Sequence, residues 1–420
     1  MFRSKTIMLL LVALLLVAPF GSSAPAAAQD DVVELEFVSW YAAEAPFIPA
    51  LEALIVEFEA QNPNIRINSV ALPFPEADQL LVRALGGDMP DISMTHTNWV
   101  GPLLEAGVLA PLEDGLLLNL EDYNPNVLGY YEGDLLTVAW AIAPTVLYYN
   151  VNLLNEAGYD APPQTFDELT EMAYAIDALD EDYYGMAIDN LQLNNSGFYF
   201  YGNIIRYFGG QLFDEDGNVV INSPETVAAY EFVDQIFEDG LSPEGVGIRE
   251  IRELFAQGII GFHRDNVLST GFPEAFTEGE FAFGEDYDLA PFPGANPGEP
   301  GPTFFVEHQL AIYEDSDHKE EAALFIDFLT GPEGTAIINS FDILHLPVRE
   351  STAALAIFTD VHPVVLASAT FAEPLPGVGP DFPAIMQAIA TGVQRVVILD
   401  ESPENVVRDI QAEVEDAVRD

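Results

Sequence analysis

Residues 146–169 decide the fold, and they read VLYYNVNLLNEAGYDAPPQTFDEL. An apolar strand is predicted up to Asn150, and a short helical turn follows that ends at Gly158, because glycine commonly follows the last turn of a helix. Thr165 and Glu168 are three residues apart, which is the spacing of a capping box at the start of a helix. The apolar residues that follow recur at helical spacing, namely Leu169, Met172, Ala173, Ile176 and Leu179. The stretch therefore predicts a strand, a turn and a capped helix.

Strands and helices alternate on the N-terminal side of this stretch. The sequence predicts strands over residues 33–39, 65–72 and 90–94, separated by helices over residues 51–58 and 79–85. Such alternation favours an α/β fold with a mainly parallel sheet and helices on both of its faces. Ligands of such sheets bind beyond the carboxyl ends of the strands.

Three further helices are predicted in the second half of the chain, each at a capping residue. They begin near Ser223, Asp317 and Ser402. Residues 291–302 are rich in proline and glycine, which predicts a loop or a crossover between domains.

Composition limits the classes of function. The chain has 420 residues, 49% of them hydrophobic, with a formal charge of -56 and no cysteine. This length suits two or three domains with substantial cores. The charge argues against nucleic acid and anionic lipid surfaces as partners, because both would repel the protein. Acidic residues occur along the whole chain, so we interpret them as an adaptation to salt or to solubility outside a cell rather than as a cation-binding patch.

Residues 1–28 are predicted to be a secretory signal peptide. Arg3 and Lys5 precede an apolar run over residues 7–18, and small residues extend to Ala28. The run is too short to span a bilayer, so we expect no direct membrane insertion. Because no cysteine can carry a lipid, we expect a soluble protein of the periplasm or cell exterior that has no lipid anchor.

Several segments together resemble one family. Residues 146–169 are similar to a signature of the extracellular, maltose-binding-protein-like sugar-binding proteins that feed bacterial ABC importers. Further similar segments occur in the order that the family has, at residues 85–92, 107–112, 255–261, 291–294, 309–312 and 322–332. Single segments of this kind are common in unrelated chains, whereas a shared order over roughly 300 residues is not.

The resemblance implies a type II-like periplasmic-binding-protein fold, in which two α/β lobes, each a mainly parallel sheet flanked by helices, are joined by hinge strands. It places residues 29–143 and 291–341 in the first lobe, and residues 144–290 and 342–420 in the second. It also implies a monomer that binds a carbohydrate in the cleft between the lobes and delivers it to the membrane-embedded subunits of an ABC permease. No cofactor is expected.

Two departures from the family pattern concern the ligand. Family members often have two glycines where this chain has Glu307 and His308, and residues 262–265 read FHRD where Trp or Asn is frequent. Bulky titratable groups therefore stand where the backbone of relatives comes close to the solute. This substitution affects the identity of the ligand more than the fold.

Sugar recognition needs flat aromatic rings that stack on C–H faces and planar polar groups that form hydrogen bonds. Residues of these kinds follow the first and third predicted strands and occupy the departures from the family pattern. The candidate ligand-binding residues are Trp40, Tyr41, Glu44, Thr97, Asn98, Trp99, Tyr199, His263, Asp265, Glu307, His308 and Phe382. For Tyr199 and Phe382, packing in a core explains the ring about as well.

The sequence contains no GxSxG motif, no phosphate-binding loop and no cysteine nucleophile, and its six histidines lack the close spacing of a metal site. We therefore expect a binding protein rather than an enzyme. A neutral mono- or oligosaccharide suits the aromatic rings and the anionic surface better than a phosphorylated or carboxylated solute, so we expect a neutral sugar as ligand. Two alternatives stay open. One is a secreted glycosidase, and the other is the same fold binding a polyamine or another cationic solute.

Overall fold

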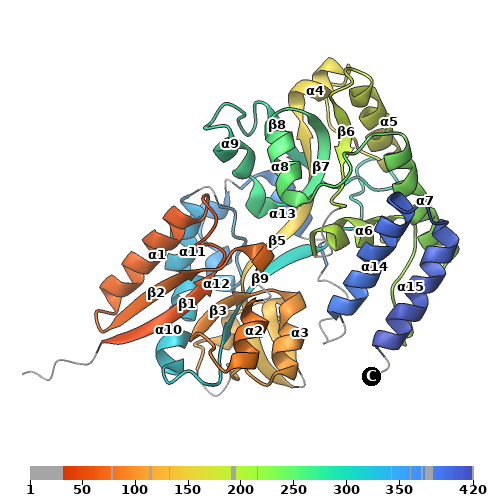
Figure 1. Cartoon of the computed structure of the whole chain (residues 1–420). Coiled ribbons are helices and arrows are strands. Elements are labelled where there is room, and N and C mark those ends of the chain that lie inside the picture. The colour runs from red at the N-terminus through yellow and green to blue at the C-terminus, as the bar shows by residue number, and fades with distance from the viewer. Residues whose placement is uncertain are drawn as a thin grey trace, which may run out of the picture.

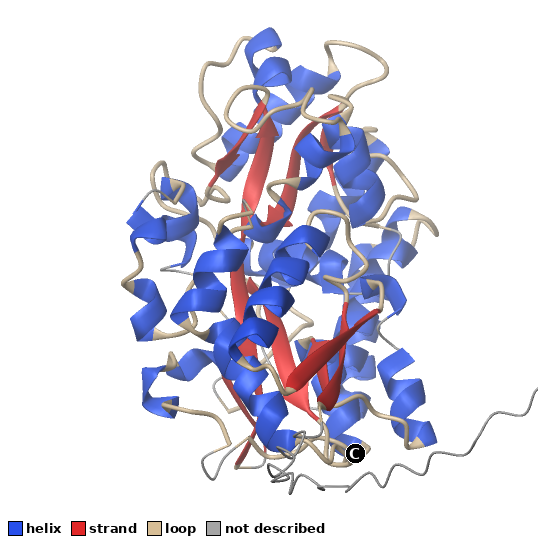
Figure 2. Ribbon diagram, turned by 90° about the vertical axis from the view of Figure 1, so that its left-hand side faces the viewer, coloured by secondary structure: helices blue, strands red, loops and turns tan. Residues whose placement is uncertain are grey.

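The computed structural model describes residues 32–76, 79–112, 116–131, 133–190, 195–214, 216–341, 343–359, 361–369, 372–373 and 382–418. The predicted signal peptide lies outside these residues. The described chain forms two lobes, at the lower left and the upper right of Figure 1. Figure 2 shows the strands in two groups, one above the other, with helices on both sides. The predicted two-lobe α/β architecture is confirmed.

The first lobe is built on the strands that the N-terminal alternation predicts. β1 (Val33–Ser39) lies between β2 (Ile65–Ala71) and β3 (Ile92–Thr95), and it runs parallel to both. β9 (Phe305–Ile312) then pairs antiparallel with β3. Because β1, β2 and β3 are parallel, their carboxyl ends meet at one edge of the sheet.

One long strand belongs to both lobes. β5 (Asp134–Asn150) pairs with β4 (Leu128–Tyr131) and β9 in its first part, and with β7 (Ile260–Asn266) and β8 (Tyr287–Ala290) in its second. The change of partner falls between Pro144, which pairs with Phe305, and Thr145, which pairs with Asn266. The second lobe adds β6 (Tyr184–Ala187), parallel to β7.

The prediction that each lobe has a mainly parallel sheet is wrong, because both sheets are mixed. Antiparallel pairs join β5 to β4, β7, β8 and β9, and β3 to β9. The reason is that β5 and β9 carry the chain between the lobes in opposite directions and lie side by side, which requires antiparallel pairing. The parallel pairs are β1 with β2, β1 with β3 and β6 with β7, and the chain between the strands of each pair contains at least one helix.

Helices cover both sheets. Helix α1 packs on β2 and α11, α10 packs on β1 and β9, and α5 packs on β6 and β7. Helices α6, α7, α14 and α15 pack on one another. The bounds of the helices are α1 (Ile48–Gln61), α2 (Gln79–Gly86), α3 (Thr97–Glu105), α4 (Val151–Glu156), α5 (Phe166–Asp177), α6 (Asn195–Tyr207), α7 (Pro224–Glu238), α8 (Ile248–Ala256), α9 (Phe272–Phe276), α10 (Lys319–Thr330), α11 (Pro332–Asn339), α12 (Glu350–Ala353), α13 (Pro363–Ala369), α14 (Phe382–Val397) and α15 (Pro403–Ala417).

The predicted helix starts are close to the observed ones. Thr165 caps α5, since its Oγ1 accepts a hydrogen bond from the backbone N–H of Glu168 at 3.1 Å. The Glu168 carboxylate in turn accepts one at 2.7 Å from the backbone N–H of Gln164, one residue before Thr165. Ser223 and Ser402 cap α7 and α15 in the same way. For α10, the N-cap residue is His318 rather than Asp317, and its side chain makes no capping bond.

Segments after β9 contact both groups of elements. Helix α12 packs on α11, whereas α14 and α15 pack on α6 and α7. The boundaries of the lobes along the sequence, at residues 143, 290 and 341, stay predictions.

Candidate ligand-binding site

A cavity of about 110 Å³ lies between the two lobes. Its lining from the first lobe comes from the carboxyl ends of β1, β2 and β3 and from β9, which is the edge where ligands of such sheets bind. Its lining from the second lobe comes from α6, α8, α9 and the end of β7. The lining residues are Trp40, Glu44, Phe47, Phe74, His96, Thr145, Tyr199, Phe200, Ile248, Arg252, Arg264, Asp265, Asn266, Leu268, Ser269, Phe272, Val306 and His308.

Aromatic rings form the wall on the first lobe. Trp40 directly follows β1, and its ring meets that of Phe74 edge-on with centroids 5.5 Å apart. Trp99 on α3 packs against both rings, at 6.0 Å from Trp40 and 5.3 Å from Phe74, but it does not line the cavity. Trp99 therefore supports the two rings from behind.

A buried hydrogen-bond network holds one polar lining residue. The Tyr41 hydroxyl lies 2.9 Å from Nδ1 of His308 and 2.7 Å from Nε2 of His345. Burial lowers the pKa of His308 well below its usual value and that of His345 to about 3. Both imidazoles are therefore neutral near pH 7, and the hydroxyl donates to one ring while accepting from the other. His308 lines the cavity, and Tyr41 lies behind it, stacked on Phe47 with centroids 4.1 Å apart.

Charged side chains gather on the wall of the second lobe. The guanidinium of Arg252 donates to both carboxylate oxygens of Asp265, at 2.6 and 3.0 Å, and to the Ser269 hydroxyl at 2.7 Å. It also lies 4.6 Å above the ring of Phe272. Across the cavity, burial raises the pKa of Glu44, and the charge of Arg252 opposes that rise. Arg252 is thus fixed by a bidentate pair, which leaves it little freedom to move.

Arg264 binds the two chain segments that run between the lobes. Its Nε and Nη2 donate to the Thr145 hydroxyl of β5 at 3.0 and 2.7 Å. Its Nη2 also donates to the hydroxyl of Thr303, just before β9, at 2.7 Å. The guanidinium lies 4.3 Å above the ring of Phe292.

Two contacts cross the cavity between the lobes. The Tyr199 hydroxyl on α6 lies 3.2 Å from Nε2 of His96, which follows β3. The rings of Phe47 and Phe272 meet edge-on with centroids 5.9 Å apart. These contacts hold the lobes close together.

Of the predicted site residues, Trp40, Glu44, Tyr199, Asp265 and His308 line the cavity together. The structure thus brings residues from four separate segments to one place, since Trp40 and Glu44 both lie between β1 and α1. Their role in binding a ligand stays a prediction.

The other predicted residues lie elsewhere. Tyr41 and Trp99 are the supporting residues described above, and Glu307, on β9, accepts a hydrogen bond at 2.6 Å from Nε2 of Gln309. His263 is buried among second-lobe rings, 4.9 Å from Tyr148, and Phe382 is buried against Phe198 at 5.6 Å. The side chains of Thr97 and Asn98, at the start of α3, lie outside the described part of the structure.

Sequence reasoning missed several lining residues, above all Arg252, Arg264, His96 and Thr145. The signal that could have found the two arginines is the scarcity of basic residues, since the chain has 13 against 69 acidic ones. Because basic residues are so few, each one is a candidate for a structural or functional role. His96 directly follows the third strand, so the expectation that ligands bind beyond the carboxyl ends of the strands could have found it. Thr145 lies inside β5, where the sequence gives no such signal.

No group of three or more acidic or histidine side chains among the described residues could hold a metal ion. Likewise, none of the helices in the described ranges is both long and apolar enough to cross a membrane.

Two α/β lobes around a shared cavity, lined by rings and hydrogen-bonding groups from both, define a solute-binding protein. The chain belongs to the bacterial extracellular solute-binding protein family, whose sequence model matches residues 42–336. This is a family of binding proteins rather than enzymes.

Known proteins resemble this chain in sequence or in fold. A binding protein of Brucella abortus is 26% identical over 387 residues, which cover 87% of this chain and 89% of that protein. The maltotriose-binding protein of Pyrococcus abyssi is 27% identical over 200 residues, or 46% of this chain and 41% of that one. An ABC transporter solute-binding protein of Thermotoga lettingae, solved with bound α-D-tagatose, has a TM-score of 0.81 and 21% identity, covering 92% of this chain and 99% of that one.

Proposed function

We propose that this protein is the extracytoplasmic receptor of an ABC importer, which binds a carbohydrate between its lobes and delivers it unchanged to the permease. The observation that carries the proposal is the lining of the cavity, where both lobes contribute aromatic rings and hydrogen-bonding side chains. The maltotriose and tagatose in the names of two relatives support the choice of a carbohydrate.

The lining suits the two kinds of surface that a sugar presents. Trp40 and Phe74 on one lobe and Phe272 on the other offer ring faces or edges for C–H groups. His308 and Asp265 are held by neighbours and offer hydrogen-bonding atoms in fixed positions. Because these groups are already held in place, sugar binding does not have to offset the conformational entropy lost in ordering them.

The size of the cavity requires the lobes to separate before a ligand enters. Small-molecule sites usually measure about 300 to 1,000 Å³, whereas this cavity measures about 110 Å³. Opening breaks the Tyr199–His96 hydrogen bond and the Phe47–Phe272 contact. A ligand that touches both lobes then favours closure through its higher affinity for the closed state.

The protein acts outside the cytoplasm as a soluble monomer without a lipid-bearing cysteine. Its partners are the carbohydrate and the permease subunits, and it catalyses no reaction. The family assignment and the absence of cysteine from the sequence support these statements.

Calorimetric titration of the purified protein with maltotriose, maltose, tagatose, glucose and spermidine tests the proposal. We expect one-to-one binding of a sugar, and chromatography after prolonged incubation should recover that sugar intact. A sugar at 100 times its Kd should add about 2.7 kcal/mol to the free energy of unfolding. Shorter products with turnover would establish a glycosidase instead, and binding of spermidine alone would establish a receptor for cations.

A further inference from the structure

Arg264 is a buried cation that has no anionic partner among the described residues. Only 7% of its surface is exposed. Within the described residues, every other buried or half-buried lysine or arginine has a carboxylate oxygen within 4.0 Å. Arg249, which also has none, is exposed to solvent. The absence of a partner is therefore specific to a side chain that lines the cavity between the lobes.

The hydrogen bonds of Arg264 are also incomplete. Nε and Nη2 are satisfied by neutral oxygens, namely the hydroxyls of Thr145 and Thr303 and the carbonyl of Pro302. Nη1 is buried and has no acceptor among the described residues. An arginine side chain has five N–H donors in a rigid fork, so two of them are left without a partner.

A charge in this state is costly to keep. Burying an ion without a counter-ion is among the largest penalties in a folded protein. Burial and the nearby Arg206 lower the pKa of Arg264 to about 9, so the side chain still carries its charge at neutral pH. A ligand that supplies a negative charge and hydrogen-bond acceptors would offset this desolvation penalty.

Resting on the proposed function, we infer that the carbohydrate carries an anionic group, a carboxylate or a phosphate, which docks on the guanidinium of Arg264. Carboxylates and phosphates match the geometry of the guanidinium fork and accept from two of its N–H groups at once. A neutral hydroxyl offers Nη1 an acceptor but leaves the charge unpaired.

The other charged groups in the lining do not compete for this role. Arg252 and Asp265 neutralise each other in their bidentate pair. The charge interactions of Glu44 involve Arg252, Arg249 and Asp265, and not Arg264. Among the charged residues of the lining, Arg264 is therefore the one that would interact favourably with an anion.

The expectation of a neutral sugar came partly from the net charge of the whole chain. Exposed acidic groups act weakly on a ligand in the cavity, because physiological salt screens charges beyond about 8 Å. A desolvated guanidinium in direct contact is screened much less. The local cation therefore outweighs the acidic surface.

Matched sugars test this inference on the unmodified protein. Calorimetric titrations at one ionic strength compare glucose with glucuronate and glucose 6-phosphate, and galactose with galacturonate and galactose 6-phosphate. We expect an anionic member to bind at least tenfold more tightly than its neutral counterpart, and the two acidic arms separate carboxylate from phosphate. Neutral sugars binding as tightly as anionic ones would overturn the inference but keep the carbohydrate receptor. Failure of every sugar, neutral and acidic, would remove the proposed function as well.

Variants then assign the preference to one side chain. Arg264→Met should reduce the advantage of the anionic sugar over its neutral counterpart at least tenfold. Arg408→Met, which removes an equal charge from the exposed surface of α15, should keep the wild-type preference. If Arg264→Met loses affinity equally for neutral and anionic sugars, Arg264 only positions the two chain segments that run between the lobes. If that variant does not fold, Arg264→Lys serves instead, because lysine keeps the positive charge but lacks the planar guanidinium. If Arg264→Lys binds the anionic sugar with the same advantage as the wild type, the anion does not dock on the guanidinium.

Discussion

Trp40 and Trp99 have the same appearance in the sequence, since each follows a predicted strand among polar residues. In the structure their rings occupy different positions relative to the cavity. Trp40 lines the cavity, while Trp99 packs behind it and behind Phe74. At the scale of single residues, the position of the ring relative to its neighbours thus decides whether it can touch a ligand.

Removal of the Trp40 ring should weaken carbohydrate binding. We expect Trp40→Ala to lower the affinity at least tenfold, which corresponds to about 1.4 kcal/mol, because the stacking surface is lost. Trp99→Phe, which keeps a supporting ring, should bind within threefold of the wild type. Titration calorimetry measures both, and equal affinities of wild type and Trp40→Ala would remove Trp40 from the site.

The Tyr41 hydroxyl should contribute to stability rather than to affinity alone. Tyr41→Phe leaves Nδ1 of His308 and Nε2 of His345 without their shared partner in a buried place. Unsatisfied buried groups cost about 1 to 3 kcal/mol, and urea unfolding should show a loss of that size. Tyr159→Phe removes a hydroxyl that donates to Glu171 near the surface and should change stability by less than about 0.5 kcal/mol. A loss no larger than that of the control would show that the network is dispensable.

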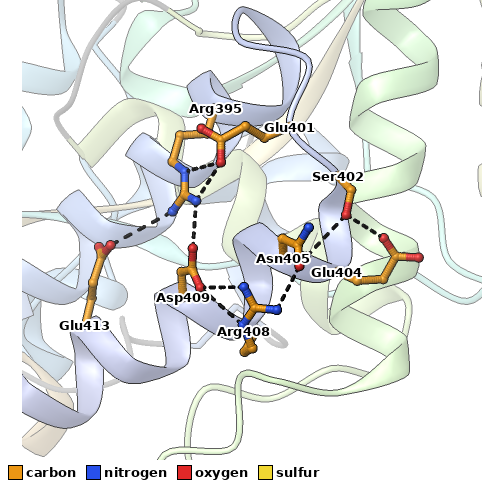
Figure 3. Close-up of polar contacts among 8 residues, drawn as sticks. All are labelled: Arg395, Glu401, Ser402, Glu404, Asn405, Arg408, Asp409 and Glu413. Atoms are coloured by element: carbon orange, nitrogen blue, oxygen red, sulfur yellow. Dashed lines mark hydrogen bonds and ion pairs between the residues drawn. The ribbon is translucent and has the colours of Figure 1, made fainter.

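At the scale of elements, the C-terminal helices are joined by an ion-pair network (Figure 3). Arg395 on α14 donates to Glu401 at 2.7 Å and to Asp409 on α15 at 2.8 Å, and it lies 4.0 Å from Glu413. These helices also bury an apolar stripe, which includes Val406 and Ile410. Arg395 attracts three carboxylates at once and so offsets the repulsion among them.

Replacement of Arg395 should therefore destabilise the protein in a salt-dependent way. We expect Arg395→Met to lower the free energy of unfolding by about 1 to 2 kcal/mol at low salt, more than the usual surface ion pair of up to about 1 kcal/mol, because three acidic groups lose one shared partner. The loss should shrink in 1 M salt, where screening acts within about 3 Å. Arg66→Met, which removes a single exposed pair with Glu59, is the control. Equal losses at both salt concentrations would contradict an electrostatic role.

At the scale of the whole molecule, acid should destabilise the protein before its carboxylates titrate. Burial lowers the pKa of His263 to about 4, that of His345 to about 3, and that of His308 well below its usual value. The unfolded chain takes up these protons near pH 6.5 and the folded protein does not, so the free energy of unfolding falls as the pH drops below about 6.5. Burial raises the pKa of Glu44, Asp177 and Asp234, and these carboxylates act in the opposite direction.

Urea unfolding between pH 7.5 and pH 5 measures this effect. Each buried histidine should contribute a slope of about 1 kcal/mol per pH unit below pH 6.5. His263→Leu removes one titrating group from a site between Tyr148 and Phe255, so its slope should be smaller by about that amount. A slope equal to that of the wild type would show that His263 is not a neutral histidine in the folded protein.

Much of the fold follows from local sequence signals. The caps at Thr165, Ser223 and Ser402 mark helix starts because a hydroxyl three residues ahead of a free backbone N–H satisfies it wherever the chain lies. The strands β1 and β3 are likewise visible in their apolar residues. The sequence also predicted that residues after these strands meet at one edge. In the structure Trp40, Phe74 and His96, which follow β1, β2 and β3, line the cavity, whereas Tyr41 and Trp99 do not.

The amino-acid sequence by itself determined the starts of several helices and the strands on the N-terminal side, because capping and apolar periodicity are local. It also indicated the two-lobe fold and the family, through the resemblance of segments in a shared order along the chain. Only the tertiary structure decided that β5 serves both sheets, that the sheets are mixed, and that Arg264 lies buried against Thr145 and Thr303 without a carboxylate. These features depend on pairs of residues far apart in the sequence. Their energies come from burial and charge, which no local pattern records.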